Sequence, residues 1–259
     1  MVATADQLDF LTAQAGLRAR IEGQMTAMFS QLAGQGLDPR EVRDQVAALA
    51  RTLVSEYGSA AATFAADWYN DMRLTAGVYD RFIATEYVQD FDEQIDATVR
   101  RAAGSLFGDV DVAGFVETVA AKASQYAMDG ARNTIIQNSY RDQRAGGWQR
   151  VPHGKTCDFC IMLVDRGAVY KKSTANFRAH RHCDCSAVPS WDKDAKEASP
   201  LAYEASSRMQ GLRDRAAKGD RSAQRQLDGY RKRVNTYIDD NKEQFAKVRQ
   251  DYNLPAEPA

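Results

Sequence analysis

All four cysteines of this 259-residue chain lie between Cys157 and Cys185, together with two of its three histidines. The segment reads C-D-F-C, then nineteen residues, then H-R-H-C-D-C. A structural zinc ion takes four soft or borderline ligands in a tetrahedron, and two ligand pairs far apart in sequence commonly supply them. The spacing therefore predicts a zinc site that joins two segments of the chain.

The segment offers more ligands than one zinc ion needs. Cys157 and Cys160 would supply one edge of the tetrahedron through a tight turn. The candidates for the other edge are His180, His182, Cys183 and Cys185. His180 and Cys183 are three residues apart, which one helical turn or a compact loop can close on a single ion. Cys183 and Cys185 would lie on one face of an extended segment, so an all-cysteine site is the alternative.

Two other uses of the cysteines are less favoured. Disulfides would require an oxidising compartment, and the N-terminal sequence M-V-A-T-A-D-Q lacks the basic and apolar regions of a secretory signal. A nucleophilic cysteine with His180 or His182 as its base is a third alternative. Because the other thiols lie only a few residues away, the spacing favours metal binding over a single reactive cysteine.

Charge is distributed unevenly along the chain, although the net charge is −1. Residues 1–138 carry 11 Lys and Arg against 19 Asp and Glu, whereas residues 139–185 carry 9 against 4. The basic residues of this second stretch are Arg141, Arg144, Arg150, Lys155, Arg166, Lys171, Lys172, Arg178 and Arg181. Such cations can offset the charge of buried thiolates or meet nucleic-acid phosphates. Without a recognisable DNA-reading motif, the first explanation is favoured.

Helical patterns dominate the first part of the chain. Thr4 is a predicted N-cap, and the helix that it starts should stop at Gly34–Gly36. Asp38 followed by Pro39 predicts the start of a second helix, with a break near Gly58. Further helices are predicted at residues 60–74, 79–106 and 112–140. The apolar stripes of these segments are interpreted as core, and the sequence contains no cofactor motif in them.

The pattern changes at Gly146. Residues 146–192 contain short β-prone pieces and turn residues. Such a small unit buries little apolar surface and needs a staple to be ordered, and zinc is one such staple. Its predicted miniature core consists of Trp148, Phe159, Tyr170, Phe177 and Trp191. Helix returns beyond Pro200, with Asp220 as a predicted cap.

The predicted fold is therefore mainly α. It combines an elongated helical bundle or arm (1–145), a small zinc-stapled α+β or loop-rich knob (146–192) and a C-terminal helical arm (193–259).

Residues 131–191 resemble the phage Mu F-like minor head proteins, especially those of actinobacterial tailed phages. The resemblance rests on N-T-I-I-Q-N-S-Y-R-D from Asn133, G-W-Q-R from Gly147, T-C-D-F-C-I-M-L from Thr156, and H-x-x-C-x-C from His180. Cys157 and Cys160 match the first cysteine pair of that family. His180, Cys183 and Cys185 match its H-x-x-C-x-C element. Arg181 replaces the proline that the family often has, so His180 and His182 both stay open as ligands.

The resemblance implies a structural minor capsid protein that acts in head morphogenesis of a tailed phage. The surplus of possible ligands favours a closed, architectural Zn²⁺ site, and the sequence predicts no catalytic residues and no enzymatic activity. The expected partners are portal, capsid or scaffold proteins, with a weak contact to packaged DNA and no membrane in the assembled head; an oligomer is compatible with this role. The expected location is the virion interior near the portal, after assembly in the host cytoplasm.

Two alternatives belong to other functional classes. A zinc-dependent nucleic-acid-binding module would use the basic residues around the cysteines, and its affinity would fall steeply with salt. A nuclease of the His-Asn-His class would need a histidine pair or a histidine and an asparagine on a ββα metal fold. His153, His180 and Asn176 are too loosely spaced in the sequence to favour it.

Overall fold

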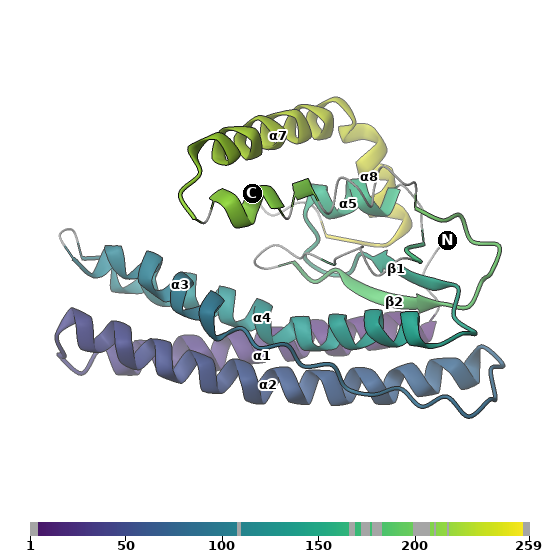
Figure 1. Cartoon of the computed structure of the whole chain (residues 1–259), viewed down its shortest axis with the longest axis horizontal. Coiled ribbons are helices and arrows are strands. Elements are labelled where there is room, and N and C mark those ends of the chain that lie inside the picture. The colour runs from purple at the N-terminus through teal and green to yellow at the C-terminus, as the bar shows by residue number, and fades with distance from the viewer. Residues whose placement is uncertain are drawn as a thin grey trace. The chain divides into compact units, whose positions relative to one another are not determined.

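The computed structural model describes residues 5–107, 110–165, 169–171, 177, 183–198, 208–209, 211–216 and 218–255. Helices predominate in the described chain, and its strands form one two-stranded sheet (Figure 1). The predicted fold class, mainly α with a small mixed part, is confirmed. The chain divides into two compact units. The N-terminal unit is built mainly from Asp9–Asn138, and the C-terminal unit mainly from Ser139–Ala179 and Cys183–Ala259.

Helices make up most of the N-terminal unit, and three of them are long. These are α1 (Ala5–Ala33), α2 (Pro39–Thr75), the short α3 (Asp92–Ala102) with the 3₁₀ turn η1 (Ala103–Leu106), and α4 (Val112–Arg141). The Asp38 carboxylate accepts a hydrogen bond from the Arg40 backbone amide at 2.8 Å, and Pro39 occupies the first turn, as predicted. Thr4, the predicted cap of α1, lies outside the described residues.

The helices share one apolar core. Its fully buried large side chains come from α1, α2, α3 and α4, and they include Ile21, Phe29, Val46, Val99 and Phe115. Burial of apolar surface supplies the main stabilising free energy of such a unit.

The predicted helix break at Gly58 is wrong, because α2 continues through it to Thr75. Gly58 instead permits a close crossing of α2 and α4. A Cβ atom at Gly130 of α4 would overlap the Gly58 carbonyl oxygen, and Gly58 itself lies 3.7 Å, measured from its ideal Cβ position, from the Ala127 carbonyl oxygen. The glycine pair thus marks a contact between two backbones, and the tertiary contact outweighs the low helix propensity of glycine.

The predicted helix at 79–106 is wrong in its first half. Residues 79–91 have no helical hydrogen bonding, and the helix begins only at Asp92. The Ala84 amide donates to the Asn70 side chain at 2.9 Å, and the Tyr87 amide donates to Thr134 Oγ1 at 2.9 Å. Asn138 both accepts from the Thr85 amide at 3.0 Å and donates to the Thr85 carbonyl oxygen at 2.7 Å. Side chains of α2 and α4 therefore satisfy the backbone groups that a helix would have paired internally.

The C-terminal unit contains the small sheet. Strand β1 (Gly147–Val151) pairs with β2 (Ser186–Ser190) in antiparallel register, with Trp148 opposite Pro189 and Arg150 opposite Ala187. Tyr170 extends the pairing by a bridge to Trp148.

The predicted miniature core is found in part. Trp148 stacks on Tyr170 at 4.6 Å between ring centroids and lies 5.8 Å from Phe177. Its indole nitrogen donates to the Tyr140 hydroxyl at 2.8 Å. Trp191 instead donates to the Asp142 carboxylate, and Phe159 belongs to a different cluster.

Three helices form a second core in this unit. They are α5 (Asp158–Asp165), α7 (Arg221–Asp240) and α8 (Lys242–Asp251). Ile161 and Met162 of α5 pack with Phe245 of α8, and Val234 and Ile238 of α7 line the same cluster. The C-terminal helices thus share a core with the cysteine-bearing segment. The predicted domain boundaries at 145 and 192 stay predictions.

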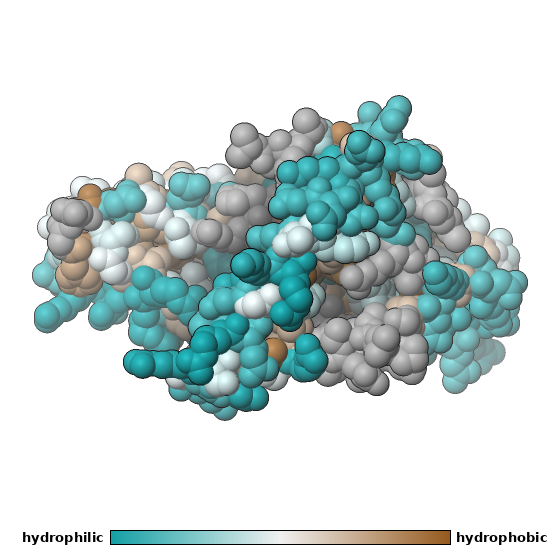
Figure 2. Space-filling model, turned by 90° about the horizontal axis from the view of Figure 1, so that it is seen from above, coloured by the Kyte–Doolittle hydropathy of each residue, from teal (hydrophilic) through white to brown (hydrophobic). Residues whose placement is uncertain are grey.

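Among the described residues, no helix combines the length and the apolar character that crossing a membrane requires. Hydrophilic residues predominate on the face that Figure 2 shows.

Candidate metal centre

Cys157 and Cys160 lie at the start of α5. The backbone amides of Cys160 and Ile161 donate to the Cys157 carbonyl oxygen at 2.9 and 3.0 Å, so Cys157 closes the first turn of this helix. Side chains three residues apart on a helix point to the same side. The turn therefore presents both thiols together, as the C-x-x-C spacing predicts.

Cys183 and Cys185 come from an extended segment that leads into β2. Asp184 lies between them and pairs with Lys155, whose amide donates to the Asp184 carboxylate at 2.8 Å and whose carbonyl oxygen accepts from the Asp184 amide at 2.7 Å. Alternate residues of an extended chain face the same side. Asp184 thus fastens the segment to the loop before α5, while both cysteines face the other way.

This loop depends on glycine at one position. Gly154 has a φ of +48°, and a Cβ there would lie 2.6 Å from the Asp184 carboxylate. Both the backbone conformation and the available space therefore favour glycine.

The four sulfur atoms converge. Those of Cys157, Cys160 and Cys183 lie within 4.8 Å of one another. Cys185 Sγ lies 3.1 Å from Cys183 Sγ and 3.2 Å from Cys160 Sγ, and Cys183 Sγ lies 3.6 Å from Cys160 Sγ. All four are free cysteines; Cys157 is half-buried and the other three are buried.

The buried Cys157–Cys160–Cys183 cluster could hold a metal ion. Two sulfurs at about 2.3 Å from one zinc ion are about 3.8 Å apart in a tetrahedron. The Cys160–Cys183 pair at 3.6 Å is close to this separation, and the two pairs that Cys185 forms, at 3.1 and 3.2 Å, would have to open by about 0.6–0.7 Å. Its donor set of soft sulfurs fits zinc and other soft-metal centres, whereas magnesium or calcium would require oxygen ligands.

His180 and His182 lie outside the described residues. Both predicted answers to which residues complete the tetrahedron therefore stay open, and Cys185 places a further sulfur beside those of Cys160 and Cys183.

Arg150 of β1 lies beneath the cluster. Its Nη1 atom is 3.2 Å from Cys185 Sγ and 3.5 Å from Cys160 Sγ, and its guanidinium stacks over the Phe177 ring at 3.7 Å from the centroid. Burial disfavours the charged guanidinium, but attraction to Cys160 and Cys185 outweighs it, so the pKa of Arg150 lies above its ordinary value. Arg150 therefore stays cationic and can offset the negative charge of thiolates.

The thiols differ in acidity. Burial raises the pKa of Cys185 to about 12. A hydrogen bond from Cys160 favours the Cys157 thiolate, but contact with Cys183 and burial together outweigh it and raise the pKa of Cys157 to about 11. Hydrogen bonds from Cys157, Cys160 and Cys185 lower the pKa of Cys183. A metal that binds thiolates must consequently displace protons from this cluster.

A family model described as VG15 protein matches residues 1–211. The chain belongs to the VG15 protein family. Membership of the VG15 family supports the assignment of this chain as a phage protein. The matched range contains the whole N-terminal unit and all four cysteines, and it ends before α7. Searches of curated proteins and of solved structures found no match.

Some residues that support the cluster carried no clear signal in the sequence. Arg150 was one of nine basic residues in its stretch, and only the structure separates it as a buried partner of two sulfurs. Arg249 lies far away in sequence, and its guanidinium donates to the Thr156 carbonyl oxygen and to the Asp158 carboxylate on either side of Cys157. A contact over 91 residues leaves no local pattern.

Proposed function

We propose that this phage protein is a structural minor capsid protein of a tailed phage, in which Zn²⁺ staples the C-terminal unit. The protein acts in head morphogenesis and contacts portal, capsid or scaffold proteins in the virion interior near the portal. It assembles from the host cytoplasm. It has no catalytic residues, and its metal serves architecture alone.

One observation carries the architectural role of the metal: sulfurs from two segments, 23 to 28 residues apart in sequence, meet in a buried cluster. A structural zinc site has all its positions filled by protein ligands, whereas a catalytic site keeps a position for water. Cys160, Cys183 and Cys185 are at most 3 % exposed, so water has little access to them. Binding would hold α5 against the segment before β2 without supplying a reactive group.

The Mu F-like resemblance supports the proposed class of virion protein. Two residues of its N-T-I-I-Q-N element, Thr134 and Asn138, hold residues 85–87 through backbone hydrogen bonds. These polar residues on α4 thus have a structural task in the N-terminal unit.

Metal analysis tests the architectural centre. Purified protein under reducing conditions should contain one zinc per chain, and its thiols should react with a thiol reagent only after chelation. The Cys157→Ser/Cys160→Ser variant should lose zinc and show new protease sites in residues 146–198, while Lys193→Ala, an exposed control, should keep both properties. Four freely reactive thiols in metal-free protein, with unchanged protease resistance, would overturn the proposed centre.

The virion role needs a separate test. Mass spectrometry of purified particles should find the protein at low copy number, and affinity purification from infected cells should recover portal, capsid or scaffold protein with it. Presence in infected cells combined with absence from particles would contradict the proposed role.

The alternative, a zinc-dependent module that binds packaged DNA around the cysteines, has less support. Arg150 of that basic stretch is buried against sulfur atoms and is not available to a phosphate. Arg141, Arg144, Lys155 and Lys171 remain exposed, but they belong to no recognisable DNA-reading motif.

A further inference from the structure

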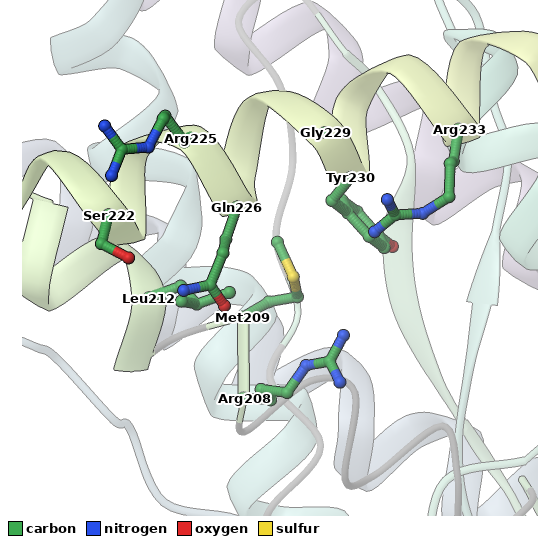
Figure 3. Close-up of a pocket in the computed structure, with 9 residues that line it drawn as sticks. All are labelled: Arg208, Met209, Leu212, Ser222, Arg225, Gln226, Gly229, Tyr230 and Arg233. Carbon is green, nitrogen blue, oxygen red and sulfur yellow. The ribbon is translucent and has the colours of Figure 1, made fainter.

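A second feature of the C-terminal unit lies away from the cysteines. A pocket of about 280 Å³ is formed between α7 and the helical residues that precede it (Figure 3). Its described lining residues are Arg208, Met209, Leu212, Ser222, Arg225, Gln226, Gly229, Tyr230 and Arg233. Three of these nine residues are arginine and none is acidic.

The hairpin that carries the pocket is strongly basic. Residues 208–233 contain nine Arg and Lys against three Asp and Glu. Asp220 pairs with Arg215 and caps α7, and Asp228 pairs with Arg231. In the described part of the chain, no carboxylate forms an ion pair with any of the three pocket arginines. The positive charge at the pocket is therefore not neutralised within the described structure.

One side of the pocket is formed by residues that recur every fourth position along α7. Arg225, Gly229 and Arg233 follow one another at this step, so they lie on one face of the helix. The two arginines are separated by about 12 Å along the axis. Gly229 leaves the space between them open, since an added Cβ would meet only Arg233 Nη1, at 3.6 Å.

The floor and the rim of the pocket differ in chemistry. Met209 and Leu212 are buried in a small apolar cluster with Ala223 and Leu227, and the half-buried Tyr230 packs against it. In Figure 3, Gln226 points from α7 toward Leu212 and Met209. An apolar and aromatic floor with a cationic rim suits a ligand that has both a flat apolar part and an anionic part.

We propose that this pocket binds nucleic acid, with one nucleotide unit on the Tyr230 side and backbone phosphates on Arg208, Arg225 and Arg233. Guanidinium groups bind phosphate oxygens in pairs of hydrogen bonds, and aromatic side chains stack on bases of any sequence. The volume lies just below the range of pockets that enclose a whole small molecule, which fits one unit of a polymer. An acidic peptide would use the rim but would leave the aromatic floor without a stacking partner.

The test is fluorescence anisotropy of the full chain with a labelled oligothymidylate of about 20 nucleotides. The variant Arg208→Gln/Arg225→Gln/Arg233→Gln should bind about tenfold more weakly, and its salt slope should fall by about two, because about 0.7 counterions are released per single-strand phosphate contact. The matched control, Arg221→Gln/Arg231→Gln/Lys232→Gln, removes the same charge from α7 outside the pocket and should lose about threefold at most. Equal losses in both triple variants would show diffuse attraction to a basic helix and would overturn the proposed site.

Two further variants test the pocket without changing charge. Gly229→Leu should fill the space between the arginines and weaken binding, whereas Gly229→Ala should bind normally, and circular dichroism should show intact helix in both.

Poly-glutamate serves as the competing polyanion. If it binds as tightly as the oligonucleotide and depends on the same three arginines, the ligand is an acidic protein segment and the assignment to nucleic acid is wrong. Oligonucleotide binding is measured on both zinc-loaded and chelated protein. An effect of the metal centre on binding is thereby separated from an effect of the pocket residues.

Discussion

Arg249 of α8 and Asp158 of α5 form an ion pair at 2.6 Å, with both side chains at most 14 % exposed. The same guanidinium donates to the Thr156 carbonyl oxygen at 2.9 Å. The two contacts lie on either side of Cys157, so α8 is attached directly to the turn that presents the first cysteine pair.

Arg249→Gln should therefore weaken both the fold and the metal centre. Loss of a largely buried, charge-assisted contact costs about 1–3 kcal/mol, because the Asp158 carboxylate is left without its partner. Urea denaturation measures this change in unfolding free energy. The loss of zinc to a chelator should also become faster, since the turn carrying Cys157 would be held less firmly.

Arg231→Gln is the matched control for that variant. Arg231 pairs with Asp228 at 3.4 Å, and both side chains are more than half exposed. An exposed pair contributes about 0–1 kcal/mol, so this variant should unfold like the wild type. Similar losses in the two variants would contradict the role given to Arg249.

Asn138→Ala should loosen residues 84–87 in the N-terminal unit. Asn138 is fully buried, and its amide replaces a strand partner for Thr85. Removing it leaves backbone groups unpaired at a cost of about 1–3 kcal/mol. Hydrogen exchange of the Thr85 amide should accelerate more than that of amides in α2. In the control Asn133→Ala, the half-buried side chain that is removed donates to the Gln89 side chain, so exchange at Thr85 should not change. Unchanged exchange at Thr85 in Asn138→Ala would refute the proposed restraint.

Gly130→Ala should destabilise the protein although alanine is the better helix former. The added methyl would overlap the Gly58 carbonyl oxygen, and separating α2 from α4 should cost about 1–3 kcal/mol. Gly23→Ala in α1 is the control, since a Cβ there meets no atom within 4 Å and the change should stabilise by up to about 1 kcal/mol. Thermal denaturation of the two variants should thus shift in opposite directions.

His153 should make the stability of the C-terminal unit depend on pH. Burial lowers its pKa below the ordinary value, and the nearby Asp184 offsets this only in part. The unfolded chain then binds a proton more readily than the folded one, so stability is full above the unfolded pKa of about 6.5 and declines as pH falls below it. His153→Gln should flatten the difference between urea midpoints at pH 7 and pH 5.5. If both proteins lose the same stability on acidification, the effect belongs to other groups.

Local sequence signals were sufficient for much of the helical framework. Asp38 with Pro39, and Asp220, act on their own immediate neighbours, so the starts of α2 and α7 could be predicted. The C-x-x-C and C-x-C spacings likewise determine which thiols share a side of a turn or an extended segment. These features depend on contacts a few residues apart, which is the range over which sequence patterns are readable.

Features that depend on distant partners could not be predicted. Residues 79–91 carry helical patterns, but Thr134 and Asn138, about fifty residues later, bind the Tyr87 and Thr85 backbone amides that a helix would have paired internally. Gly58 suggested a helix break because the local sequence gives no sign of its contact with Gly130, seventy-two residues later. The burial of Arg150 and the contacts of Arg249 with Thr156 and Asp158 could not be predicted for the same reason. Both depend on tertiary contacts, which override local propensity.

The attachment of α8 beside Cys157 also determines an order of events during translation. Arg249 follows Cys185 by sixty-four residues, so all four thiols leave the ribosome well before the helix that secures their turn. The N-terminal core, whose helices end at α4, is complete by then and can fold first. Under the proposed architectural role of zinc, the nascent cysteines pass through an interval in which metal capture competes with oxidation of the thiols.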